Sequence, residues 1–134
     1  MELAIGIIVF SAILGFGVMV LMLIKKRKHK LSAGEMSFVR NQWRMLSSGQ
    51  NPRNSILEAD KLLDYVLGKY GYTGSLGEKL KKANRVFSDV NAVWAAHKIR
   101  NRLAHELEFH PTKRDVEFVI AGIGKALRDL EIKL

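Results

Sequence analysis

The sequence contains no cysteine among its 134 residues. This absence excludes disulfide bonds, thiolate nucleophiles and cysteine-based zinc sites, and it fits a reducing compartment. A phosphate-binding loop is also missing, because the glycine-rich stretch GYTGSLGEK has neither a preceding strand nor the required lysine spacing.

Charge is missing from a long stretch near the N-terminus. Residues 3–24 carry no charged side chain, and Ser11 is the only clearly polar one. A helix of this length covers about 33 Å, enough to cross a hydrocarbon core of about 30 Å. We therefore expect a single transmembrane helix that contacts the lipid bilayer through residues 3–24. The alternatives fit less well, because a soluble core helix of this length normally includes a charge, and a cleaved signal peptide has its basic region first.

Five basic residues follow this stretch directly, and they set the expected topology. Positive flanks stay in the cytoplasm, so we predict a single-pass protein of the inner cell membrane, with its N-terminus outside and its domain in the cytoplasm. We also expect the five to contact anionic lipid headgroups. A nucleic-acid-binding tail is the alternative, which the position beside the apolar run disfavours. The five are Lys25, Lys26, Arg27, Lys28 and Lys30.

The rest of the chain is also basic. Of the net charge of +9, the run KKRKHK supplies +5 and Glu2 removes one, which leaves +5 on the other 104 residues. A polyanionic ligand such as RNA is compatible with this excess, and so is an ordinary solvated surface.

Beyond residue 30 the apolar periodicity predicts helices only. The membrane anchor with its basic flank, residues 1–30, leads into a connecting helix and loop, residues 31–53. A helical domain then occupies residues 54–134. The fold class is all-α: one transmembrane helix followed by an up-and-down four-helix bundle.

Local signals mark where the four domain helices begin and end. We predict that they span residues 54–70, 75 to about 87, 90–107 and 112–132. Ser75 with Glu78 has the form of a capping box, Thr112 with Asp115 starts the last helix, and Asp89 is placed to cap the helix before it.

The long helix over residues 90–107 has two faces at about 100° per residue. Ala92, Ala96, Ile99, Leu103 and Leu107 share the expected core face. The opposite face carries Val90, Val93 and Trp94 and then a polar stripe of His97, Asn101 and His105, with Arg100 beside it. An apolar patch that leads into a polar stripe is typical of a surface that meets a partner. The alternative is that this face packs within the bundle, with Arg100 and His105 paired to carboxylates or helix ends.

The same helix carries a recognisable motif. Residues 100–105, RNRLAH, fit the pattern R-N-x-x-x-H, and the stretches ILEADKLLDYVLGKYGYTGSLGEKLKKA, VWAAHKIRNRLAHE and PTKRDVEFVIAGIGKALRDL surround it. Over residues 54–132 the chain resembles the HEPN superfamily, whose members are small all-helical domains, commonly dimeric, and many of them metal-independent ribonucleases.

The resemblance implies a function and a site. His105 would be the acid or base when an RNA 2′-OH attacks the adjacent phosphate, and Arg100 would hold the phosphate oxygens. Asn101 would orient the imidazole or bind phosphate. No metal or cofactor is implied.

Two features keep a second function open. On an unbroken helix Arg100 and His105 lie about 140° apart, so the expected site needs a homodimer that pools two copies. The membrane anchor, and the lack of an RNA-reading module, suit a non-catalytic membrane-tethered scaffold or protein-interaction module instead. A metal site is disfavoured, because His97 and His105 lie about 12 Å apart along the helix.

Overall fold

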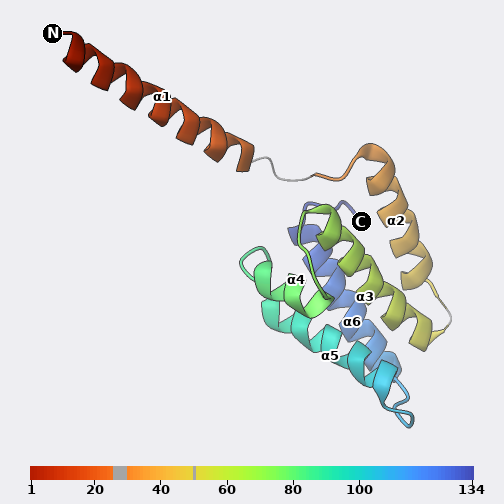
Figure 1. Ribbon diagram of the computed structural model, residues 1–134. Coiled ribbons are helices and arrows are strands. Elements are labelled where there is room, and N and C mark those ends of the chain that lie inside the picture. The colour runs from red at the N-terminus through yellow and green to blue at the C-terminus, as the bar shows by residue number, and fades with distance from the viewer. Residues whose placement is uncertain (26–29, 50) are drawn as a thin grey trace.

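The computed structural model describes residues 1–25, 30–49 and 51–134, without the side chains of residues 2–4 and 21–25 (Figure 1). Of the basic residues expected at lipid headgroups, the side chain of Lys25 and residues 26–28 lie outside this description. The described part of the chain forms helices and no strand, which confirms the all-α prediction. The helices are α1 (Glu2–Lys25), α2 (Ala33–Ser47), α3 (Pro52–Lys69), α4 (Leu76–Lys82), α5 (Val90–His105) and α6 (Lys113–Asp129).

Helix starts follow local sequence closely. Capping boxes begin α2, α4 and α6, so the expected boxes at Ser75 and Thr112 are confirmed. Asp89 accepts a hydrogen bond from the backbone N–H of Ala92 and caps α5, as predicted. Helix α3 begins earlier than expected, at Pro52, because Asn51 is its N-cap and proline suits the first helical position.

Helix ends depart from the predictions for tertiary reasons. Helix α4 stops at Lys82 instead of extending to about residue 87, and the turns that follow place Phe87 in the core. Helix α5 stops at His105, and Leu107, expected in the core, is fully exposed. Helix α6 ends at Asp129, after which the backbone turns through a positive φ at Glu131 and returns Ile132 to the core.

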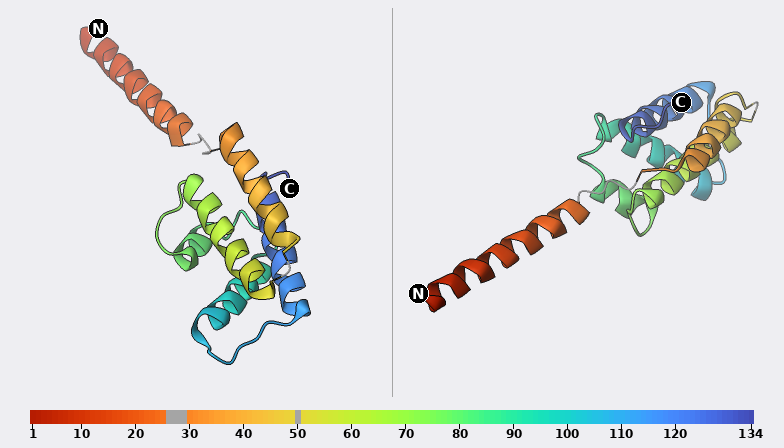
Figure 2. Two further views of the ribbon diagram at one scale, coloured as in Figure 1. Left: turned by 90° about the vertical axis from the view of Figure 1, so that its right-hand side faces the viewer. Right: turned by 90° about the horizontal axis from the view of Figure 1, so that it is seen from above.

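Helix α3 lies at the centre of the bundle and packs against α2, α4, α5 and α6 (Figures 1 and 2). Helices α5 and α6 also pack closely together. One continuous apolar core joins these helices, and α2 contributes to it. Its largest fully buried members are Ile56, Leu63, Leu67, Leu80, Leu103, Ile123, Leu127, Leu130, Ile132, Val39, Val66 and Val119.

Helix α1 projects away from the bundle in every view (Figures 1 and 2). Its large apolar side chains between Ile5 and Met19 are 48–68% exposed. Among the residues that the structure describes, no helix meets the length and apolarity needed to cross a membrane.

Candidate functional site

A buried carboxylate at the α3–α5 contact organises the candidate site. Asp60, in the middle of α3, is 3% exposed. Its Oδ1 lies 2.9 Å from Nδ1 of His97, and its Oδ2 lies 3.2 Å from Nε of Arg100. Removing an unpaired carboxylate from water costs on the order of several kcal/mol. The two α5 side chains are therefore what allows Asp60 to be buried.

The contact between Arg100 and Asp60 is an ion pair more than a hydrogen bond. Nε of Arg100 is buried, and its N–H is not aligned for a hydrogen bond although Oδ2 of Asp60 is 3.2 Å away. One terminal nitrogen, Nη1, donates to Oδ1 of Asn101 at 3.1 Å. The guanidinium is held from two sides while its side chain stays 31% exposed.

The network assigns the proton positions on His97. Because the carboxylate of Asp60 can only accept, Nδ1 of His97 is the donor. The amide nitrogen of Asn101 lies 3.2 Å from Nε2 and can only donate, so Nε2 is the acceptor. These two bonds tie α5 to α3 and to its own next turn.

A cavity of about 470 Å³ opens over this network. Helix α3 lines it with Asp60, Lys61 and Asp64, and residues 74–77, at the start of α4, line it as well. A Cβ on Gly74, where φ is +103°, would lie 2.5 Å from Oε2 of the capping residue Glu78, so only glycine fits this tight turn. From α5 the cavity is lined by His97, Arg100 and Asn101.

His105 lies apart from this cavity. It is the last residue of α5, is exposed, and lines a different surface hollow with Arg102 and residues 106–109. That hollow is held open by Arg102, which pairs with Glu106 at 3.2 Å and lies 4.2 Å from the ring centre of Phe109. No hydrogen bond or ion pair joins His105 to another described residue.

One chain thus brings together two of the three predicted site residues, Arg100 and Asn101, and leaves His105 outside. The polar stripe expected along α5 is interrupted, because His97 turns toward Asp60 and only 14% of its side chain is exposed. Val93, expected on the same outer face, is 2% exposed and belongs to the core. The alternative expectation is that Arg100 and His105 pair with carboxylates or helix ends within the bundle. Arg100 does so with Asp60, and His105 does not pair with any described residue.

Asp60 was missed by sequence reasoning, although a signal exists. It lies one turn after Ile56 and next to Ala59, both fully buried, so it is a charged residue on the core side of α3. Such a residue requires a cationic or donor partner on the facing helix. Periodicity places His97 on the outer face of its helix, and its role as the bridge between helices depends on the α3–α5 crossing.

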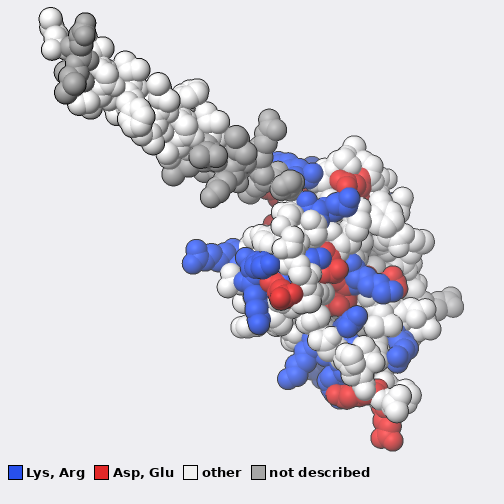
Figure 3. All heavy atoms as spheres, in the orientation of Figure 1, with Lys and Arg blue, Asp and Glu red and all other residues white. Residues whose placement is uncertain are grey.

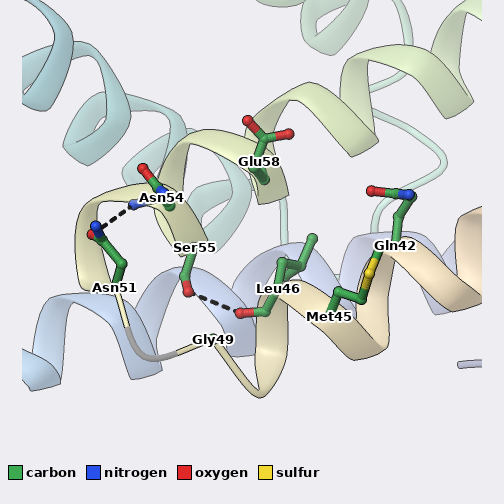
Figure 4. A pocket seen from close by; sticks show the side chains of 8 residues that line it. All are labelled: Gln42, Met45, Leu46, Gly49, Asn51, Asn54, Ser55 and Glu58. Carbon is green, nitrogen blue, oxygen red and sulfur yellow. Dashed lines mark hydrogen bonds between the residues drawn. The ribbon is translucent and has the colours of Figure 1, made fainter.

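A second cavity, of about 360 Å³, lies at the turn between α2 and α3 (Figure 4). The hydroxyl of Ser55 points across it and donates to the backbone oxygen of Leu46 at 2.8 Å. Asn51 uses its side chain to cap α3. These polar groups are engaged in closing the turn, so this cavity has a structural explanation.

The arrangement around Asp60 can present a guanidinium and an amide to an anion at the mouth of the Asp60 cavity, and His105 offers a separate imidazole at the end of α5. Within the described ranges, no three histidine, aspartate or glutamate side chains gather into a metal-binding group. Comparison with protein-family models, with curated proteins and with solved structures finds no match to this chain.

Proposed function

We propose that this chain is a membrane-anchored, cytoplasm-facing helical domain of HEPN type that binds RNA and cleaves it as a homodimer without a metal ion. One observation carries the proposal. Arg100 and Asn101 are fixed in orientation at a cavity mouth, while the imidazole of His105 is exposed on the same helix. These are the groups that phosphodiester cleavage needs.

The proposed anchor is α1. Support comes from the uncharged run at residues 3–24 and from the exposed apolar side chains described on that helix. An apolar surface of this extent marks contact with lipid or with another protein. The basic residues that follow favour lipid and an outside N-terminus.

The proposed chemistry divides the roles between Arg100 and His105. Arg100 holds the non-bridging phosphate oxygens with the donors that Asp60 and Asn101 leave free. The imidazole of His105 takes the 2′-OH proton, the 2′-oxygen bonds to phosphorus, and the bond to the 5′-oxygen breaks. That oxygen leaves as an alcohol after taking a proton from water, and the imidazole of His105 returns the 2′-OH proton to solvent.

A dimer is required because Arg100 and His105 line different cavities in one chain. Two copies related by a two-fold axis would place the helix end of one against the cavity of the other. Each composite site would then take its guanidinium and its imidazole from different copies.

The test is complementation between two inactive variants of the full chain in nanodiscs, incubated with RNA in EDTA. Arg100→Ala and His105→Ala are each expected to abolish cleavage. Dimers re-formed from an equal mixture should recover about one quarter of the wild-type activity, because half are mixed and each of these has one intact site.

Lys98→Ala is the matched control, since Lys98 is exposed on the same helix and lines no part of the Asp60 cavity. It should cleave at the wild-type rate. His105→Ala should leave the free energy of unfolding within about 0.5 kcal/mol of wild type, as is usual for exposed side chains. Full activity in either single variant, or no recovery on mixing, would contradict a pooled site.

A second candidate is a non-catalytic, membrane-tethered interaction module. It is favoured by the balance of charge at the network, because Asp60 already neutralises Arg100 and both nitrogens of His97 are engaged. On this reading the wild type neither cleaves nor retains RNA, and Arg100→Ala lowers the free energy of unfolding.

A further inference from the structure

Several segments meet at the end of the bundle where the chain arrives from α1, here called the anchor end. Lys30 lies 3.6 Å from Glu131, and the hydroxyl of Tyr70 donates to the backbone oxygen of Leu130. Ser88 donates to the carboxylate of Asp129. The anchor end therefore comprises the turn at residues 70–74, the segment 81–88 and the tail 129–134.

The opposite end of the bundle carries His105. Val90 follows Ser88 closely, and α5 then runs 15 residues to His105, a rise of about 22 Å. Helix α3 begins at this far end, and so does α6, which returns from Lys113 to Asp129. His105 and the anchor end are thus separated by most of the bundle's length, whereas Gly74 of the anchor end lines the cavity at Arg100.

Unpaired basic side chains gather at the anchor end. Lys81, Lys82, Arg85 and Lys133 are exposed, and no ion pair joins them to a described carboxylate. Lys82 donates to the backbone oxygen of Thr73 at 2.7 Å, which fixes its position without removing its charge. Figure 3 shows Lys and Arg side chains projecting from the side of the bundle that lies below the end of α1.

The carboxylates at this end are already engaged. Glu35 lies 2.8 Å from Lys69, and Glu131 pairs with Lys30. Asp129 accepts from Ser88 and Glu78 accepts from Ser75, and both carboxylates keep their negative charge. Val86 and Leu134 add apolar surface that is 38% and 40% exposed. A positive surface with apolar residues among its cations suits the headgroup region of an anionic bilayer.

Chain length keeps this surface near the membrane. Only six residues separate the end of α1 at Lys25 from the N-cap of α2 at Ser32, and the Cα atoms of these two residues can be at most about 25 Å apart. With α1 in a bilayer, the anchor end cannot move far from the headgroups, and attraction within a Debye length of about 8 Å becomes effective.

We propose that the anchor end of the bundle docks on anionic lipid headgroups through Lys81, Lys82, Arg85 and Lys133. This inference rests on the proposed membrane anchorage of α1. The chain then has two membrane contacts, one apolar and spanning, one basic and superficial. Docking would point the end of α5 away from the bilayer, toward the cytoplasm.

Energy transfer to labelled lipid tests this in the full chain. Because the chain has no cysteine, Asn84→Cys at the anchor end and Glu108→Cys at the far end each provide a single site for a donor dye. Both residues are exposed. Nanodiscs contain a headgroup-labelled acceptor lipid in either phosphatidylcholine or a mixture with phosphatidylglycerol. In anionic discs we expect higher transfer from residue 84 than from residue 108, and loss of this difference in phosphatidylcholine or in high salt.

Charge reversal identifies the surface. Each cation near an anionic surface contributes about a fivefold factor, so Lys81→Glu with Arg85→Glu should lower the ratio of docked to undocked bundle by at least about 25-fold. Arg53→Glu with Arg114→Glu makes the same change of charge at the far end and should leave the transfer unchanged. Circular dichroism checks that both double variants stay helical.

The outcomes separate the two proposals. Equal transfer from both positions in anionic discs, or equal sensitivity to both charge reversals, would overturn docking while leaving the anchor intact. A chain that does not co-elute with the discs refutes the anchor, and the docking inference falls with it.

Discussion

At the scale of single residues, Asp60 determines how α3 and α5 fit together. Its carboxylate is 5% exposed and contacts two α5 side chains that are one turn apart. The same contacts hold Arg100 and, through His97, Asn101. Structure and candidate chemistry thus depend on one buried charge, which makes substitution of Asp60 informative about both.

Asp60→Ala should lower the free energy of unfolding by about 3–5 kcal/mol, because it removes one partner of a buried ion pair and leaves Arg100 and His97 unmatched. Asp64→Ala is the matched control one turn later on α3, where the carboxylate is 43% exposed and pairs with Lys79. It should cost less than about 1 kcal/mol. Urea unfolding of both variants measures the difference, and equal losses would contradict the importance given to the buried pair.

A second prediction at this scale concerns acid. The hydrogen bond from Lys69, with further bonds from Ser32, lowers the pKa of Glu35 from its ordinary 4.5 to about 2. A lowered pKa in the folded state gives stability that is present above about pH 4.5 and lost as the pH falls toward 2. Glu78 and Asp115, which close the other two capping boxes, also have lowered pKa values because Ser75 and Thr112 donate to them.

The free energy of unfolding should therefore decline between pH 4.5 and 2, and Glu35→Gln should decline less steeply than wild type. Urea titrations at several values across this window provide the measurement. Parallel pH profiles for the two proteins would show that Glu35 is not one of the groups responsible.

The site was partly predictable from the sequence, and the reason for the limit is physical. Arg100 and Asn101 were identified because their motif is local. Asp60 lies 37 residues before His97, and their contact depends on how two helices cross, which periodicity within either helix does not specify. The exposure of His105 followed from its helical position, while the burial of His97 did not.

At the scale of helices, the α5–α6 contact depends on a glycine, Gly122. A Cβ on Gly122 would lie 3.2 Å from the backbone oxygen of Ala92, a backbone atom that cannot swing aside. Glycine at this position allows the two helices to approach closely, and this approach sets the position of α5 relative to the core.

Gly122→Ala should therefore lower the free energy of unfolding by about 1–3 kcal/mol through overpacking. Gly34→Ala, in the first turn of α2, meets nothing within 4 Å and should raise it by at most about 1 kcal/mol, since alanine favours a helix. Changes of opposite sign in the free energy of unfolding of the two variants, measured by thermal or urea unfolding, support the close contact. A stabilised Gly122→Ala would refute it.

Helix starts were easier to predict than helix ends. Capping boxes are made by side chains three residues apart, so Ser75 and Thr112 signal a start without knowledge of the fold. The ends of α4 and α6 are set by Phe87 and Ile132, which leave helical geometry to reach the core. That choice depends on space between helices that are distant in sequence.

At the scale of the whole molecule, the proposed topology is testable without purification. A fluorescent protein fused after Leu134 should fold and fluoresce, and alkaline phosphatase fused at the same place should be inactive, because the proposed topology places the domain in the cytoplasm. Replacing the five basic residues at 25–30 with glutamine should weaken the preference for a cytoplasmic C-terminal domain. Active phosphatase on the unaltered chain would reverse the orientation.

Helix α1 leaves the bundle on one side only, and this has a consequence for assembly. If α1 spans the bilayer as proposed, two molecules in the same bilayer insert in the same sense, so a two-fold axis that relates them must run along the membrane normal. Head-to-tail pairs are forbidden in the membrane although they are permitted in solution. A detergent-solubilised protein can therefore form pairings that never occur in the cell.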